Sequence, residues 1–203
     1  MIEYGIHYYD KLAEALAEHI GIVLMAMMIS LAVAAVFTVL CSLSRTFSRL
    51  LLSAFSVIYS IPSLAMLALF IPITGLGTTT AIVVLVIYNQ YLMLRNFVSG
   101  LEAVDHNVTE AAVGMGMTPM QVLTMVRLPL ARKSLIAGIR ISLISTTGIA
   151  AIAASVNAGG LGVLLFDGLR TMNVAKILWG SVLSAALALI FDGILLTVEK
   201  RFT

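Results

Sequence analysis

The sequence predicts an all-α polytopic membrane protein. Of its 203 residues, 61% are hydrophobic and only 11% are charged, and the mean hydropathy is +1.08. These values lie outside the range of ordinary soluble domains. Five apolar stretches are long enough, at roughly 20 residues for a bilayer core, to cross the membrane as helices. They lie near residues 19–41, 50–72, 78–97, 134–156 and 174–197.

Residues 1–18, MIEYGIHYYDKLAEALAE, form an N-terminal segment that differs from the spans. The segment holds four acids and one lysine without an apolar run, so it does not resemble a secretory signal peptide, and we expect it to be retained. Leu12, Leu16 and Ile20 share one side of a helix, which fits an amphipathic helix on the outer surface or a solvated extension of the first span. Residues 19–203 are expected to be a single transmembrane domain.

The basic residues predict the orientation, because translocated loops avoid lysine and arginine. Nine of the twelve can be grouped on one side: Arg45, Arg49, Arg95, Arg127, Arg132, Lys133, Arg140, Lys200 and Arg201. Only Lys11, Arg170 and Lys176 then lie on the other side. The N-terminus and the 157–173 loop should therefore face outward, and the C-terminus should face the cytoplasm.

A polar loop of about residues 99–133 separates the third and fourth spans. Asn107 and Glu110 have capping spacing for a first short helix, and Thr118 with Gln121 forms a capping pattern for a second, with Pro119 at its start. Gly114 and Gly116 can end the first helix with positive φ angles, while Pro129 should end the second and hold Leu128 extended. These features predict a helix-turn-helix.

Several apolar residues of this loop exceed what a free loop requires. They are Met115, Met117, Met120, Val122 and Leu123, and Glu110, Gln121 and Arg127 border them in the sequence. Methionine is common at adaptable binding surfaces, and an exposed apolar patch with a polar rim indicates a docking site. We therefore expect a soluble partner to bind here; a locally packed hairpin is the alternative.

The loop resembles the EAA motif of permease subunits of bacterial ATP-binding cassette (ABC) importers. The matching residues are Glu110, Ala111, Ala112, Gly116, Leu128 and Pro129, with Val126 where isoleucine is usual. The resemblance implies a cytoplasmic coupling helix that sits in a groove of a separate ATPase subunit. It further implies two ATPase subunits that bind ATP and Mg, a second copy of this permease or a related one, and an extracytoplasmic substrate-binding protein. The implied location is the bacterial cell membrane.

Other segments resemble permeases for osmoprotectants such as glycine betaine, carnitine and choline, with a methionine-permease-like type I fold. These segments are Ser60–Ile82, Leu94–Gly116 and Asn157–Leu169. The GGLG stretch also occurs in methionine-type permeases, so methionine, like an ergothioneine-type betaine, stays open as a substrate.

Polar residues inside spans usually face a bundle interior or a cavity. Tyr59 and Ser60 of the second span, and Tyr88, Asn89, Gln90 and Tyr91 of the third, are therefore translocation-pathway candidates. Tyrosine rings attract quaternary ammonium groups. Hydrogen bonding between helices is the competing interpretation. In the outer loop, Gly159, Gly160 and Gly162 provide flexibility for a gate or a contact with the binding protein; a simple connection is the alternative.

Two charges fall within spans at comparable depth. Arg140 lies about two turns into the fourth span and Asp192 a similar distance from the end of the fifth, so we expect a structural ion pair or separate snorkelling toward the interface. A role in proton coupling is less well supported. The small residues of the fourth span, Ser142, Ser145, Thr146, Thr147 and Gly148, suit close helix packing.

No feature indicates chemistry carried out by this chain. Cys41 is the only cysteine, and His7, His19 and His106 lack metal-ligand spacing and are expected at surface or interfacial positions. Phosphate-binding, zinc-protease and nucleophile-elbow motifs are absent, so no catalytic residue, metal or cofactor is expected. A net charge of +2 gives no indication of nucleic acid. A self-contained channel or carrier and an intramembrane enzyme remain the alternatives from other functional classes.

Overall fold

The computed structural model describes residues 2–201, which are helical apart from short connections. In chain order the helices are α1 (Ile2–His7), α2 (Tyr9–Leu43), α3 (Arg45–Tyr59), α4 (Ser63–Thr74), α5 (Thr78–Glu102), α6 (His106–Gly114), α7 (Pro119–Gln121), α8 (Leu128–Ala153), α9 (Leu161–Arg170) and α10 (Val174–Arg201). A π-helix, η1 (Val122–Arg127), joins α7 to α8, and a 3₁₀ turn, η2 (Ala154–Val156), follows α8.

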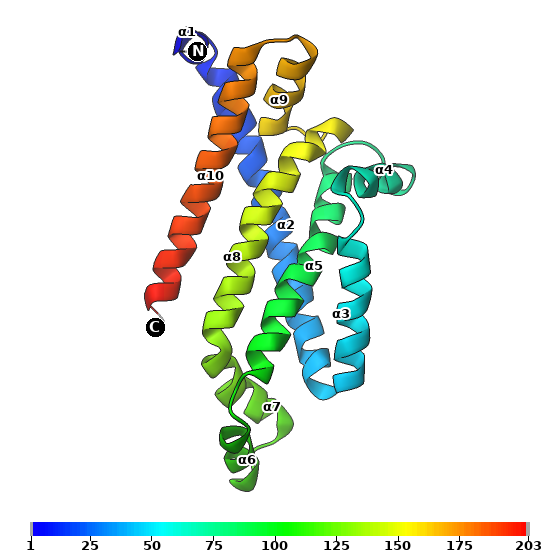
Figure 1. The fold of residues 1–203 in the computed structure, drawn as a ribbon, viewed down its shortest axis with the longest axis vertical. Helices are drawn as coiled ribbons and strands as arrows, with labels where there is room; N and C mark the ends of the chain where they lie inside the picture. Colours follow the sequence, from blue (N-terminus) through cyan, green and yellow to red (C-terminus); the bar gives the residue numbers. More distant parts are fainter. Residues whose placement is uncertain (1, 202–203) are drawn as a thin grey trace.

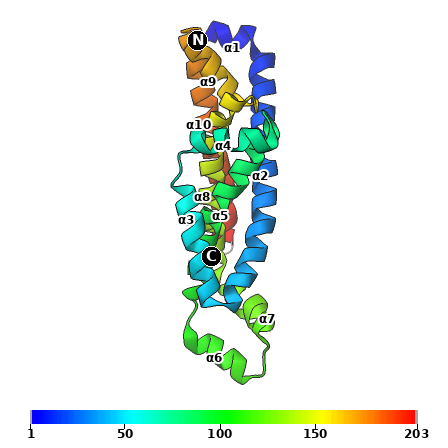
Figure 2. The same cartoon turned by 90° about the vertical axis from the view of Figure 1, so that its right-hand side faces the viewer.

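The long helices run up and down the long axis of the molecule (Figure 1). Four stretches are individually long and apolar enough to cross a membrane: Tyr9–Leu43, Thr78–Glu102, Pro119–Val156 and Val174–Arg201. Helices α3 and α4 meet this criterion only together. Helices α6 and α7 extend from one end of the bundle, the α6–α7 end, while α9 and the N-terminus lie at the other, the α9 end (Figures 1 and 2).

The expected second span is broken. Helices α3 and α4 meet at 98°, and α4 lies across the bundle rather than along it (Figure 1). Pro62 is the cause, because it has no N–H and its ring clashes with the carbonyl four residues earlier in a continuing helix. The break leaves the main-chain oxygen of Ile61 outside both helices, and the Tyr88 hydroxyl of α5 donates a hydrogen bond to it.

Helices α2, α5 and α8 form the centre of the bundle. Val23, Val84 and Ala150, one from each of these helices, are fully buried in the same apolar cluster. Helices α5 and α8 approach closely at two glycines. A Cβ on Gly138 would lie 2.8 Å from the Asn96 side chain, and one on Gly100 would overlap Ser134. Small residues therefore set the helix spacing, as is usual in membranes.

The N-terminal extension is continuous with the first span, since α2 runs without interruption from Tyr9 to Leu43. Leu12 is buried in a cluster with Leu161 of α9 and Leu187 of α10. The apolar side of the segment thus packs against the protein rather than lying separately on a surface. The C-terminal end of α10 leans away from the bundle (Figure 1). Within the described chain, only Gly180 and Leu187 of α10 are buried.

Candidate functional site

The loop between α5 and α8 begins with a capped helix. The carboxylate of Asp105 accepts a hydrogen bond from the main-chain N–H of Asn107 at 2.8 Å, so Asp105 is the N-cap of α6. The expected cap at Asn107 is wrong by two residues, because the acidic side chain before it satisfies the first free N–H groups. Glu110 and Ala111 are exposed on α6, whereas Ala112 is buried.

A tight turn connects α6 to α7. Gly116 has a φ of +87°, while Gly114 still belongs to α6. A Cβ on Gly116 would meet nothing within 4 Å, so the glycine is favoured by the backbone conformation and not by lack of space. Thr118 and Gln121 form the expected capping box: Thr118 N–H donates to the Gln121 side chain at 2.8 Å, and Gln121 N–H donates to the Thr118 hydroxyl at 3.4 Å.

Pro129 does not end the second helix of the loop. Residues 119–156 form one continuous helical stretch, and Leu128 is helical with φ −61° and ψ −47°, so the expected extended Leu128 is wrong. The π-helix η1 ends at Arg127, two residues before the proline, and Leu128 N–H donates to Leu123 O, five residues earlier. The wider turn accommodates a residue that lacks an N–H and would clash in a regular α-helix.

The loop is anchored to α5 and α8 through residues of η1. Leu123 is buried with Leu101 and Ala131, and Arg127 donates from Nε (3.3 Å) and Nη2 (3.0 Å) to the main-chain oxygen of Leu101. Val122 and Leu123 therefore do not belong to an exposed patch, contrary to expectation, because they are the inner face of η1. The large apolar residues that are exposed on the loop are Val108, Val113, Met115, Met120 and Met125.

Three tyrosines lie beside the break between α3 and α4. The Tyr59 ring is 5.1 Å from that of Tyr91 and 5.5 Å from that of Tyr88, centroid to centroid. Tyr88 is 3% exposed and its hydroxyl is bonded to Ile61, whereas Tyr59 and Tyr91 are partly exposed. Arg95 donates to the Tyr91 hydroxyl at 3.2 Å. Ser60 is exposed at the break itself, with its hydroxyl donating to Val57 O.

Asn89 and Gln90 lie inside the bundle. Asn89 donates to the Ser30 hydroxyl of α2 at 3.1 Å and accepts from the Thr146 hydroxyl of α8 at 2.9 Å, and Gln90 donates to Ser30 O at 3.3 Å. Both side chains are 2% exposed. These contacts are the helix-to-helix hydrogen bonds that were the alternative for these positions; contact with a substrate stays a prediction.

The 157–173 loop is mostly the packed helix α9. The main-chain N–H of Gly160 donates to the Glu18 carboxylate at 2.9 Å, and Gly159 and Gly160 have φ angles of +86° and +76°. A Cβ on Gly162 would overlap the main chain of Ala151. The three expected gate glycines thus fix α9 against α2 and α8 in this structure.

At the end of α9, Asp167 forms ion pairs with Arg170 and with Lys176 of α10. The neighbouring Lys176 ammonium, followed by the Arg170 guanidinium, holds the pKa of Asp167 below its usual 3.8. The corner between α9 and α10 is therefore joined by charge as well as by packing.

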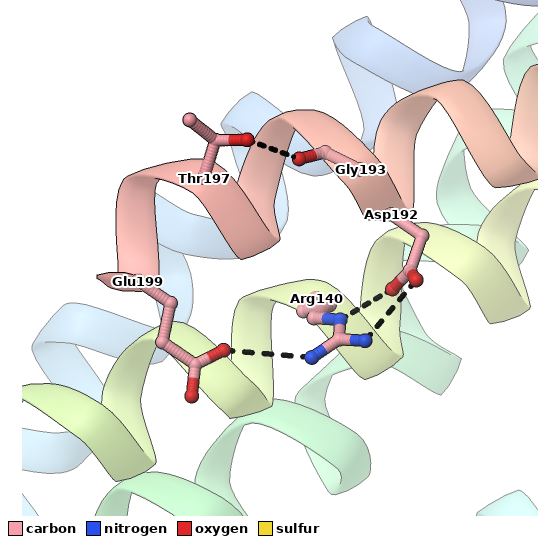
Figure 3. Close-up of polar contacts among 5 residues, drawn as sticks. All are labelled: Arg140, Asp192, Gly193, Thr197 and Glu199. Carbon is pink, nitrogen blue, oxygen red and sulfur yellow. Dashed lines mark hydrogen bonds and ion pairs between the residues drawn. The ribbon is translucent and has the colours of Figure 1, made fainter. Parts of the chain in front are cut away.

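The expected ion pair between α8 and α10 is present (Figure 3). The Arg140 guanidinium binds the Asp192 carboxylate through Nε and, at 3.1 Å, through Nη2. Its Nη1 also lies 3.5 Å from Glu199, a partner that the sequence alone did not indicate. Glu199 follows Asp192 by two helical turns, so the two acids share one face of α10 and flank the arginine (Figure 3).

One histidine departs from expectation. His19 is fully buried, and its Nε2 lies 3.1 Å from Thr147 O of α8, so the predicted surface or interfacial position is wrong for this residue. The glycines that precede α9 explain the burial, because Gly160 lies directly against His19. His7 and His106 are exposed, as expected.

The chain has clear relatives. The family model described as "Binding-protein-dependent transport system inner membrane component" matches residues 26–203. The chain is 37% identical over 186 residues to the choline transport system permease protein OpuBB of Bacillus subtilis (strain 168), covering 92% of this chain and 86% of that protein. It is also 37% identical over 186 residues to the carnitine transport permease protein OpuCB of Listeria monocytogenes, covering 92% and 85%.

Similarity also extends to a solved structure. A chain of the inward-facing MetNI methionine ABC transporter superposes with a TM-score of 0.80 at 25% identity, covering 100% of this chain and 99% of that chain.

Proposed function

Because the chain belongs to the family of binding-protein-dependent transport system inner membrane components, we propose that it forms the translocation pathway of an ATP-driven importer for a quaternary-ammonium compatible solute: glycine betaine, carnitine or choline. The observation that carries the proposal is the identity of 37% to choline and carnitine permeases over 86% and 85% of their length. The 25% identity to the methionine transporter is lower, although the fold is shared.

The five crossings of this proposal are α2, the bent pair α3–α4, α5, the α8 stretch and α10. The N-terminus would lie outside and the C-terminus in the cytoplasm, in agreement with the distribution of basic residues. A bundle of this size does not enclose a pathway alone, so the working unit would hold two permeases. The exposed apolar face of α10, including Val182, Leu189 and Ile190, is available to lipid or to another chain.

In this proposal α6 and α7 are the coupling element. Glu110 and Ala111 face outward where an ATPase groove would meet them, with the exposed methionines Met115 and Met120 nearby in the same loop. Arg127 and Leu123 fasten the loop to α5 and α8, so a displacement of the loop would reach the spans as a rigid movement. ATP and Mg would be bound by two separate ATPase subunits, and a binding protein would deliver the solute.

The tyrosines beside the helix break are the proposed solute contacts. Tyr59 and Tyr91 are partly exposed, and an aromatic face attracts a quaternary ammonium group by roughly 0.5 to 2 kcal/mol. Such a weak contact suits a pathway, because the solute must also leave. The break at Ser60–Pro62 adjoins this cluster and provides a position at which α3 and α4 could change their relative orientation.

Competition between solutes tests the substrate class. The permease is reconstituted in liposomes with its ATPase and its binding protein. These liposomes should take up labelled glycine betaine, carnitine or choline only when ATP is present on the side of the membrane that carries the ATPase subunits. Unlabelled methionine should not compete. Uptake of methionine or ergothioneine, but of none of these three solutes, would agree with an importer and overturn the proposed substrate class. Uptake without ATPase subunits would indicate an ATP-independent carrier or channel.

A further inference from the structure

A basic cavity lies at the α6–α7 end, apart from the tyrosine cluster. It is an open cavity with a volume of about 740 Å³, lined by residues from the ends of α2, α3 and α5 together with α6 and η1. Two lining residues, Ser42 and Arg45, belong to the turn from α2 into α3, which lies at this end of the bundle (Figures 1 and 2). Among its lining residues are three arginines, Arg45, Arg49 and Arg127, and only one carboxylate, that of Glu102.

Two of these arginines lack a counter-charge. Arg45 and Arg49 are one helical turn apart on α3, where two like charges destabilise a helix. Within residues 2–201, neither forms a hydrogen bond or an ion pair. Arg127 differs, because its Nε and Nη2 are occupied by Leu101 O. The cavity thus presents two free guanidinium groups without an acceptor.

The remaining polar groups of the wall do not compensate for this charge. The hydroxyls of Thr38 and Ser42 donate to main-chain oxygens of their own helix, Ala34 O and Val39 O. They are neutral, so the Glu102 carboxylate is the one negative charge beside three guanidinium groups in the lining. Guanidinium groups bind phosphate through two parallel hydrogen bonds, which makes a phosphate the ligand that best fits unpaired arginines in a cavity.

The position of the cavity favours a lipid headgroup over a soluble phosphate compound as the ligand. It lies where the first apolar helix ends at Leu43 and the next begins at Arg45. The flanking residues Leu43 and Leu50 are 65% and 66% exposed, so hydrocarbon can cover the helices beside it. A headgroup at the edge of the bilayer meets both requirements at once, whereas a soluble phosphate compound would use only the arginines.

We propose that this cavity binds the phosphate of an anionic phospholipid through Arg45 and Arg49, with an acyl chain along the exposed apolar residues of α2 and α3. Such a lipid would neutralise the two arginines and tie the α2–α3 turn to the base of the α6–α7 loop. The site is independent of the solute carried.

Native mass spectrometry of the purified, delipidated full chain tests the proposal. The chain is titrated with phosphatidylglycerol, phosphatidylcholine or inorganic phosphate. The wild-type chain should hold one phosphatidylglycerol about tenfold or more tightly than phosphatidylcholine, since each basic residue near a lipid surface adds a several-fold factor. The variant Arg45→Gln with Arg49→Gln should lose this preference.

Matched variants separate the site from general charge. Arg132→Gln with Lys133→Gln removes two exposed cations of α8 that do not line the cavity, and it should keep the preference. Arg45→Lys with Arg49→Lys keeps the charge and should retain part of the preference for phosphatidylglycerol. This variant still tests the proposal if the glutamine variant does not fold. Equal phosphatidylglycerol binding in the glutamine variant would overturn the proposal. Displacement of bound lipid by inorganic phosphate would instead assign the cavity to a soluble phosphate compound.

Discussion

The Arg127 guanidinium donates two hydrogen bonds to the main-chain oxygen of Leu101 and so joins the base of the α6–α7 loop to the last turn of α5. Leu101 is also buried against Leu123, so one point of α5 is held by both a charged hydrogen-bond pair and an apolar contact. In the proposed importer, a movement imposed on the loop would reach α5, which carries Tyr88 and Tyr91, through these contacts.

Replacing Arg127 should separate loop movement from transport. Arg127→Met keeps the length of the side chain but leaves Leu101 O without its donors. Hydrogen bonds to charged groups contribute about 1.5 to 3 kcal/mol, which predicts a lowering of Tm by roughly 3 to 12 °C in a chain of this size. We expect less solute transported per ATP hydrolysed by the reconstituted complex. Arg132→Gln, an exposed change five residues beyond the end of η1, should alter neither quantity.

The loop turn should be sensitive at Gly116 and not at Gly114. Gly116 has a φ of +87°, so Gly116→Ala should cost about 1 to 2 kcal/mol of loop stability. Gly114 is helical with open space around it, and Gly114→Ala should be neutral or slightly stabilising. Hydrogen exchange of residues 106–121 measures the difference; equal exchange in both variants would contradict a constraint by backbone conformation.

The tyrosine cluster should act through its rings. Tyr91→Phe keeps the aromatic face and should retain uptake, whereas Tyr91→Leu should raise the KM for a quaternary-ammonium solute by about 2- to 30-fold, as expected for the loss of one cation-π contact. The variants Tyr88→Phe and Tyr88→Leu are compared with these two Tyr91 variants. Tyr88→Phe should lower stability because Ile61 O loses its donor. A Tyr91→Leu variant with unchanged KM would remove this residue from the pathway.

Removing one partner of the ion pair between α8 and α10 should lower the stability of the chain more than removing both partners. Arg140→Met alone takes the guanidinium away from both Asp192 and Glu199, and Asp192→Leu alone leaves the arginine with only its longer contact. The double variant removes both members of the shorter pair, so it should be less destabilised than the sum of the two single variants. Thermal unfolding of the four chains in detergent gives the coupling. Strict additivity would mean that the pair is structurally silent.

Much of the fold could be predicted because the relevant signals are local. The apolar stretches gave the approximate positions of the long helices, and the Thr118–Gln121 capping box formed as its spacing indicates. The Arg140–Asp192 pair joins distant residues but was also accessible, since two opposite charges at one depth of a bilayer attract each other.

The parts that were missed depend on contacts between distant residues or on unusual helix geometry. Pro129 does not end its helix because the π-turn before it widens the backbone, a feature without a clear sequence signal. Pro62 does break its helix, although both prolines follow apolar residues. His19 is buried because Gly160, 141 residues later, packs over it. The packing partner of Leu123 at Leu101 likewise arises only from the folded loop.

The most direct measurement of the central claim is ATP-dependent accumulation of labelled glycine betaine in proteoliposomes that hold this chain, its ATPase and its binding protein. Each complex is compared with one carrying Glu110→Ala. We predict accumulation against a gradient by the unmodified complex, and its loss in the variant while solute still binds to the binding protein. Accumulation that continues without ATP or without ATPase subunits would contradict the account.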